Sequence, residues 1–193
     1  MSAPPQDLVE AAESVLERHG WHGMTSELIA EAAGINRVTL YRRGYNAGSL
    51  LAAAAQSASR EFRDGAWRAL SNAGSARERL ALLLDALFDV ADRHLALLAM
   101  LYDGPTAVFH LSVASSDATS TRFEFAEPFE RILRDGLADG TLDSDDPAHD
   151  AELIFNAAGW TYVHMRRSHA QPPRRAREDM HRLIGALVAP APA

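Results

Sequence analysis

Apolar residues recur along almost the whole chain at the three- and four-residue spacing of amphipathic α-helices. No stretch combines the apolar–polar alternation and the β-branched enrichment that a half-buried strand needs. The clearest stripe lies near the end of the chain and consists of Met180, Leu183, Ile184, Leu187 and Val188. The pattern predicts an all-α protein of about nine helices, with breaks at glycine, proline and polar clusters.

Local start and stop signals delimit the expected helices. Serine, threonine and asparagine side chains can cap the first turn of a helix, and glycine commonly ends one. In the first part of the chain these signals predict a helix ended by Gly20, a second capped by Thr25 or Ser26 and ended by Gly34, a third over 37–43 capped by Asn36, and a fourth from about Ala47 to Trp67. Further on they predict a long helix from about Ala76, helices over 123–139 and 148–168, and a last helix opened by Pro172 and Pro173.

Charge is unevenly distributed and supports a division of the chain near residue 68. The chain of 193 residues has a formal net charge of -7. Residues 1–68 contain seven Arg and eight acidic side chains, whereas residues 69–193 contain twelve Arg and eighteen acidic ones. No acidic residue occurs between Ala32 and Arg60. We therefore expect an N-terminal domain over 1–68 with a local basic surface, and a C-terminal helical domain over 69–193.

Residues 25–44 have the layout of a helix-turn-helix, in which one short helix braces the DNA backbone while the next enters the major groove. For the second of these helices to dock, Leu40 must face the core. That orientation turns outward Val38, Thr39, Tyr41 and Arg42, and it leaves Arg37 and Arg43 at the flanks. These side chains suit base edges and phosphates, although a two-helix turn in an all-helical protein can also serve packing alone.

The same segment carries a dense sequence motif. It reads Thr25-Ser26-x-x-Ile29-Ala30-x-x-Ala33-Gly34-Ile35-Asn36-x-x-Thr39-Leu40-Tyr41-Arg42. With the residues around it, from 8 to 51, this segment resembles the N-terminal domain of the TetR family of transcriptional regulators. The resemblance implies three N-terminal helices for DNA, a fourth that links to a larger ligand-binding and dimerisation domain, and two C-terminal helices that pair with a second subunit.

The resemblance also implies a function and roles for individual residues. The implied function is a sequence-specific, DNA-binding transcriptional regulator, most often a ligand-responsive repressor, that acts as a homodimer on a near-palindromic operator in double-stranded DNA. Phosphate and backbone contacts would fall to Thr25 or Ser26 and to Tyr41, and base-edge contacts to Arg37, Val38 and Thr39.

Three positions depart from the family pattern. Where the family usually has His, Phe and Lys after the Tyr-Arg pair, this chain has Arg43, Gly44 and Ala47. Arg43 can replace the His as a phosphate donor, whereas the lost Lys leaves only the N-terminus of the fourth helix to attract a phosphate. The alternative function is therefore a helical small-molecule binding protein that has lost DNA binding.

Signatures of catalysis are absent from the sequence. It contains no motif of a nucleotide-binding loop, zinc protease or serine hydrolase, and no cysteine. His164 and His169 are five positions apart, which would place them off a common helical face. The sequence therefore predicts no enzyme, no cofactor and no metal site. Acidic and basic side chains interrupt the longest apolar stretch, so we expect no membrane span and a cytoplasmic location.

Two further sites are expected in the C-terminal domain. Aromatic side chains with polar groups at helical spacing favour a pocket for a small, largely apolar ligand, although core packing can also explain the aromatic residues. The candidate ligand-binding residues are Tyr102, Phe129, Asn156, Trp160 and His164. The candidate residues of a homodimer interface are Met180, Leu183, Ile184 and Leu187, because no later helix remains to cover their stripe.

Overall fold

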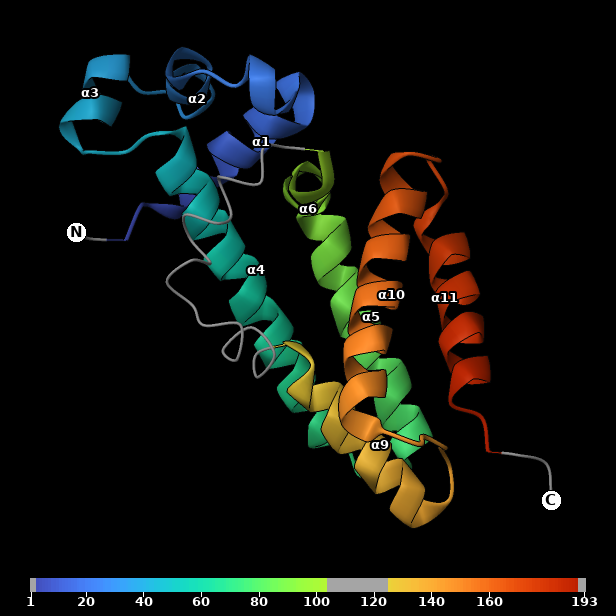
Figure 1. Cartoon of the computed structure of the whole chain (residues 1–193). Coiled ribbons are helices and arrows are strands. Elements are labelled where there is room, and N and C mark those ends of the chain that lie inside the picture. The colour runs from blue at the N-terminus through green and yellow to red at the C-terminus, as the bar shows by residue number, and fades with distance from the viewer. Residues whose placement is uncertain (1–2, 104–124, 191–193) are drawn as a thin grey trace. The chain divides into compact units, whose positions relative to one another are not determined.

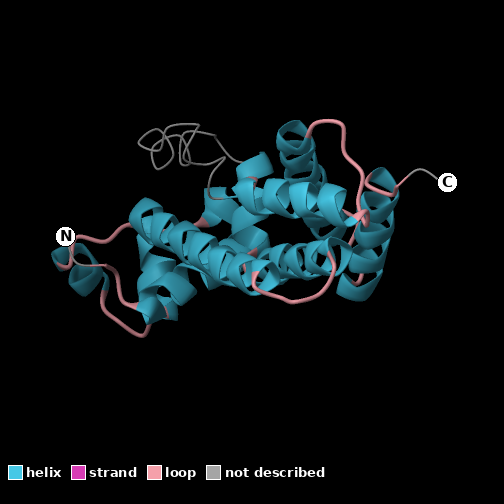
Figure 2. Cartoon of the chain, turned by 90° about the horizontal axis from the view of Figure 1, so that it is seen from below, coloured by secondary structure: helices cyan, strands magenta, loops and turns pink. Residues whose placement is uncertain are grey.

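The computed structural model describes residues 3–103 and 125–190, without the side chains of 101–103. Within these residues the chain is helical and contains no strand (Figure 2). The nine helices of this described part are α1 (Gln6–Gly23), α2 (Ser26–Ala32), α3 (Arg37–Arg42), α4 (Ala47–Leu70), α5 (Ala76–Arg93), α6 (Leu95–Asp103), α9 (Glu127–Asp139), α10 (Pro147–Arg167) and α11 (Pro173–Leu187). The all-α prediction is therefore confirmed.

The chain divides into two compact units, each built from two segments (Figure 1). The N-terminal unit consists of Met1–Ser59 and His94–Ser115, and the C-terminal unit of Arg60–Arg93 and Ser116–Ala193. Helix α4 contributes to both, with residues 47–59 in the first and 60–70 in the second. The boundary that the sequence predicts, at residue 68, lies near the end of this helix.

In the N-terminal unit, helices α1, α2, α3 and α6 and the first part of α4 share one apolar core. Its buried residues are Leu8, Val9, Ala12, Val15, Leu16, Ile29, Ala30, Leu40, Tyr45, Leu50, Leu51, Ala54, Leu97 and Met100. Most of them follow the three- and four-residue spacing from which the helices were expected. Leu40 is fully buried, as the docking of α3 requires.

The local caps of this unit lie where the sequence predicts them. The Thr25 hydroxyl accepts a hydrogen bond from the Leu28 amide at 3.3 Å and begins α2. The Asn36 side chain accepts one from the Val38 amide at 2.8 Å and begins α3. Gly20 differs in part from expectation. Its φ of 66° interrupts α1, but the helix then continues to Gly23.

The long helix predicted from about Ala76 is broken at His94. Helix α5 ends at Arg93 and α6 begins at Leu95. The His94 side chain is buried, and its Nδ1 lies 2.7 Å from Oε1 of Glu13 on α1. Since Glu13 is distant in sequence, no local pattern marks this break. The pair joins α6 to α1 within the N-terminal unit.

In the C-terminal unit, α5, α9, α10, α11 and the second part of α4 pack together. Figure 1 shows α10 and α11 side by side. Helix α4 approaches α5 closely at Gly65, where a Cβ would lie 2.5 Å from Cβ of Ala86. Only glycine fits this approach without a shift of one helix, because that contact lies far inside van der Waals distance.

A partly buried carboxylate joins three helices of this unit. Asp92 of α5 accepts hydrogen bonds of 2.8 Å from the Tyr162 hydroxyl and Arg166 Nε of α10 and from Arg177 Nη2 of α11. Burial raises the pKa of Asp92, but the hydrogen bonds from Arg177, Arg166 and Tyr162 outweigh it and hold the pKa below its ordinary value. Burial and the Asp92 carboxylate raise the pKa of Tyr162 to about 12.

We expect Asp92→Asn to destabilise the protein near neutral pH by about 1–3 kcal/mol, because an amide replaces a charged acceptor of three hydrogen bonds. A carboxyl with a depressed pKa stabilises the fold above its unfolded pKa and loses that contribution as the pH falls through the folded value. Thermal unfolding followed by circular dichroism at pH 7 and pH 3 should therefore show a smaller acid destabilisation for the variant. Asp64→Asn, at an exposed carboxylate of the same unit, is the control. Equal pH profiles for wild type and Asp92→Asn would contradict this role.

Candidate nucleic-acid interface

Helices α2 and α3 form a helix-turn-helix. The turn between them contains Gly34, whose φ of +65° favours glycine. Ile35 after the turn donates its amide to the Ala30 carbonyl at 2.9 Å, and Asn36 then begins α3. Each helix therefore starts at its own side-chain cap, and the residues between them follow one defined path.

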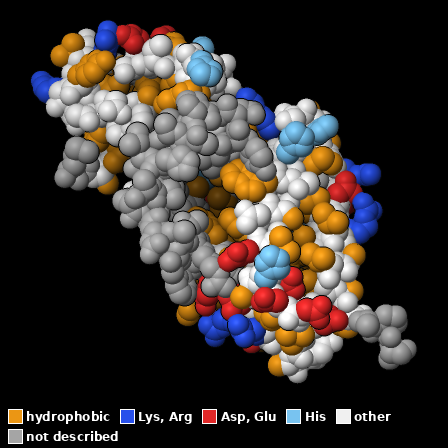
Figure 3. Space-filling view, viewed as in Figure 1, with side chains coloured by type: hydrophobic (Ala, Val, Ile, Leu, Met, Phe, Trp, Pro, Cys, Tyr) orange, Lys and Arg blue, Asp and Glu red, His pale blue; other side chains and the backbone are white. Residues whose placement is uncertain are grey.

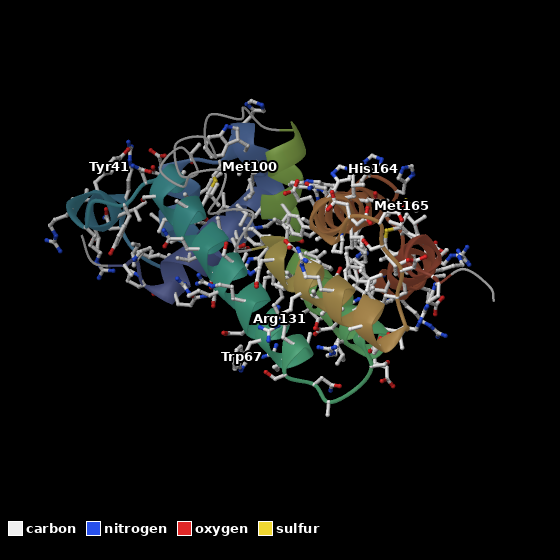
Figure 4. All side chains as sticks on the ribbon, turned by 60° about the horizontal axis from the view of Figure 1, so that its bottom comes forward. Tyr41, Trp67, Met100, Arg131, His164 and Met165 are labelled. Carbon is white, nitrogen blue, oxygen red and sulfur yellow. The ribbon has the colours of Figure 1, made fainter. Side chains whose placement is uncertain are left out.

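The buried Leu40 side chain determines which residues of α3 face solvent. Val38 is 70% exposed and Tyr41 is 55% exposed. Figure 4 shows Tyr41 on the outside of α3. Thr39 is half-buried, while Arg42 and Arg43 are exposed. The structure thus places side chains that suit base edges and phosphates together on one accessible surface.

The remaining three predicted residues lie at the starts of α2 and α3. Thr25 and Arg37 are exposed, and Ser26 is half-buried. Arg37 Nη2 donates to the Tyr41 hydroxyl at 3.4 Å, and the Arg37 guanidinium lies 5.1 Å from the centre of the Tyr41 ring. The hydrogen bonds from Arg37 and Ser26 lower the pKa of Tyr41. Ser26, Arg37 and Tyr41 therefore form one connected polar group.

An acidic residue that the sequence analysis missed also belongs to this surface. Glu27, in the first turn of α2, forms an ion pair with Arg37. The acid-free stretch of sequence begins only at Ala32 and so leaves Glu27 out. The signal that could have found it is the helix-turn-helix itself, which brings the first turns of α2 and α3 together. The surface is therefore not uniformly basic.

The positions that depart from the family pattern have a defined local structure. Gly44 has a φ of +76°, and the next residue, Tyr45, is buried in the core of the unit. Its hydroxyl donates to the Ala3 carbonyl at 3.4 Å. Asn46 and Ser49 cap α4 reciprocally, with the Ser49 amide 2.9 Å from the Asn46 side chain and the Asn46 amide 3.0 Å from the Ser49 hydroxyl. An aromatic ring thus fills the core beside Gly44.

Solved structures with the same fold include the fatty acid degradation regulator FadR from Bacillus halodurans, with a TM-score of 0.76 and 20% identity over 96% of this chain and 97% of that one. The ketosteroid transcriptional regulator KstR2 of Mycobacterium tuberculosis has a TM-score of 0.72 and 17% identity over 98% and 99%. The TetR family regulator PfmR from Thermus thermophilus has a TM-score of 0.70 and 20% identity over 94% and 98%. No curated protein matches the chain significantly.

Residues 8–43 match the family model of bacterial regulatory proteins of the tetR family. The chain therefore carries a DNA-binding domain of the TetR type. It is therefore a DNA-binding transcriptional regulator and not an enzyme, as the sequence predicts. The alternative, a helical small-molecule binding protein that has lost DNA binding, stays a prediction. Among the described residues, no helix combines the length and the apolar character needed to cross a membrane.

The predicted ligand-binding residues of the chain do not converge on one point. Phe129 is fully buried, and its ring centre lies 6.4 Å from those of both Phe62 and Phe155. Trp160 is half-buried, and Asn156 is exposed with its side-chain amide bonded to the Glu152 carbonyl at 2.7 Å. His164 is exposed, and the Tyr102 side chain lies outside the described residues. The sequence analysis missed Phe62 because it lies on α4, before the predicted domain boundary.

The expected separation of His164 and His169 is wrong. Helix α10 ends at Arg167, so His169 is not on the helix, and Ala170 with a φ of 49° helps to reverse the chain. The two Nε2 atoms lie 3.2 Å apart. A pair supplies only two ligands, and the described residues contain no group of three or more His, Asp or Glu placed to hold a metal.

The four predicted interface residues separate into two pairs. Met180 and Ile184 are 5% and 1% exposed and face the core of their own unit, with Ala176 and Val188 on the same side of α11. They are therefore not available to a second subunit. Leu183 and Leu187 are 51% and 60% exposed. The sequence could not separate the two edges of so wide an apolar stripe.

Two substitutions on the helix-turn-helix should have different effects on DNA binding. Thr39→Ala removes a side chain that the sequence predicts to contact base edges and should change the preferred sequence, at about 1–3 kcal/mol for each lost contact. Arg43→Ala removes a predicted phosphate donor and should weaken binding to all sequences, with a salt dependence flatter by about one unit for each subunit bound. Fluorescence anisotropy against a panel of duplexes at several salt concentrations measures both.

The control for these variants is Arg60→Ala, which removes the same charge at an exposed position of the C-terminal unit. It should leave both sequence preference and salt dependence unchanged. A change of sequence preference in Arg43→Ala, with an unchanged salt dependence, would reverse the assignment of the two roles.

Proposed function

We propose that this TetR-family protein is a ligand-responsive repressor that acts as a homodimer on a near-palindromic operator. The observation that carries the proposal is the exposed face of α3, with Val38, Tyr41 and Arg42 held outward by the buried Leu40. A six-residue helix offers few contacts to one half-site. Two copies related by a two-fold axis present two such helices, which matches the symmetry of a palindrome.

The exposed apolar residues of α10 and α11 support a dimer. Leu153 is 48% exposed, and Leu183 and Leu187 are exposed to a similar degree or more. Hydrophobic side chains gather over these two helices on the face shown in Figure 3. Apolar patches of this kind commonly mark a protein–protein interface. The proposed interface therefore uses Leu153, Leu183 and Leu187, without Met180 and Ile184.

Replacing Leu183 and Leu187 together by Glu should give a folded monomer, because two charges would have to be buried in the proposed interface without partners. Light scattering coupled to size exclusion measures the mass, and circular dichroism checks the helix content. The matched control is the double replacement of Leu82 and Leu137, both 43% exposed on α5 and α9, by Glu. If the α11 variant stayed as dimeric as this control, the interface would lie elsewhere.

An aromatic cluster in the C-terminal unit supports a largely apolar ligand. The Phe62 ring centre lies 5.6 Å from that of Phe125, and Phe125 stacks on Phe155 at 5.4 Å. Two proteins with the same fold are named for fatty acid degradation and for ketosteroids. Both names concern molecules that are mostly hydrocarbon. We therefore place the ligand in the class of fatty acyl or steroid compounds, with contacts to this cluster.

A ligand releases DNA only if it binds better to the conformation that does not fit the operator. Helix α4 offers a connection, since residues 47–59 belong to the N-terminal unit and Phe62 lies in the C-terminal unit. Within the proposal, a ligand against Phe62 would shift α4 and with it α3. A coupling of about 1–3 kcal/mol would weaken operator binding about 5- to 150-fold.

The proposed function is tested by a gel shift with the promoter DNA next to the gene for this protein, at low and moderate salt. We expect a shift that survives moderate salt and competitor DNA, and that palmitate, palmitoyl coenzyme A or cholest-4-en-3-one reverses. The same compound should change the Trp fluorescence of the wild type, and Phe155→Ala, within the aromatic cluster, should weaken this binding. If the promoter competes no better than random DNA, the proposed operator is wrong. If none of the compounds changes DNA binding, the proposed ligand class is wrong.

A further inference from the structure

Among the described residues, Glu27 is the one acidic side chain that forms an ion pair with a predicted DNA-contacting residue of α3. Its carboxylate pairs with Arg37 Nη1, and the two side chains are 54% and 53% exposed. The other terminal nitrogen of the same guanidinium, Nη2, lies 3.4 Å from the Tyr41 hydroxyl. Arg37 is thus held on two sides, by a charge from α2 and by a ring from α3.

Without these two contacts, an arginine at this position would favour DNA phosphates over base edges. A flexible guanidinium in the first turn of a helix that enters the major groove is attracted to any phosphate within reach. Phosphate contacts carry no sequence information. The Glu27 carboxylate offers Arg37 a competing partner on the protein and repels nearby phosphates. The Tyr41 ring restricts the guanidinium further, because a cation–π contact stabilises the guanidinium near the face of the ring.

We propose that Glu27 is a specificity-determining positioning residue, which holds Arg37 toward base edges and keeps it from random phosphates. The inference rests on the proposed function, because it requires that the protein distinguishes an operator from other DNA. Glu27 acts through Arg37 and needs no contact with a base. Its contribution is a larger ratio of operator affinity to nonspecific affinity, at the expense of total affinity.

A second role for Glu27 is compatible with its position and must be separated from this one. An acidic side chain in the first turn of a helix stabilises that helix through the helix dipole, whatever lies opposite it. Removing Glu27 could therefore loosen α2 and weaken DNA binding generally. The positioning role predicts the reverse result for nonspecific DNA, because the released Arg37 gains access to phosphates.

The test compares Glu27→Gln with Glu31→Gln. Glu31 lies on the same helix, is exposed, and takes part in none of the ion pairs of the described residues. Both variants remove one negative charge. Glu27→Gln should bind random duplex DNA about three- to tenfold more tightly at low salt than the wild type. Its affinity should depend on salt more steeply, by about one unit for each bound subunit. Glu31→Gln should change operator and random affinity by the same factor.

A double-mutant cycle shows whether Glu27 acts through Arg37. In an Arg37→Ala background, Glu27→Gln should no longer change the ratio of operator to random affinity. Glu27→Asp should restore part of that ratio, since the carboxylate remains. Thermal unfolding of each variant reports any loosening of α2 separately.

Two outcomes would overturn this inference while leaving the proposed function intact. One is equal behaviour of Glu27→Gln and Glu31→Gln, with a wild type that still prefers its operator. The other is an undiminished effect of Glu27→Gln in the Arg37→Ala background. A wild type that binds operator and random DNA equally would instead overturn the proposed function, and with it the basis for a specificity role.

Discussion

The exposed face of α3, which is predicted to contact DNA, depends on the burial of one side chain, Leu40. Helix α3 has only six residues, fewer than the 12–15 or so that an isolated helix needs to be even marginally stable in water. Its helical state is therefore held by contacts outside itself, namely the Asn36 cap and the packing of Leu40 into the core. Because side chains keep fixed angles around a helix, burial of this one residue also directs Val38, Tyr41 and Arg42 outward.

The sequence predicted well what short-range chemistry decides. The caps at Thr25 and Asn36, the turn at Gly34 and the all-helical pattern depend on neighbours within a few positions, and all are found in the structure. At the break, His94 pairs with Glu13, 81 positions away. A partner at that distance leaves no trace in a periodic pattern, so only the fold could reveal it.

The same limit explains the outcome for the C-terminal sites. Asn156, Trp160 and His164 do share one face of α10, as their spacing indicates. The buried face of that helix is instead marked by Ile154, Ala158 and Tyr162, which are offset by two positions, or about 200° around the axis. Periodicity gives the angle between residues of one helix. Which of two opposite faces turns inward is decided by the other helices that pack on it.

The ion pairs of this protein follow two different physical regimes. The Asp92 carboxylate is partly buried among three donors from two helices, and breaking these contacts would leave a poorly solvated charge without its partners. Such a group can hold helices together but cannot be exchanged easily during function. The pair between Glu27 and Arg37 is more than half exposed on both sides, and an exposed pair contributes only about 0–1 kcal/mol. That energy is smaller than the roughly 1–3 kcal/mol of a good base contact, so Arg37 can leave Glu27 for a matching base, while the pair still competes with a random phosphate. A stronger, buried pair would keep Arg37 from contacting base edges. Without any pair, Arg37 would bind phosphates of any sequence.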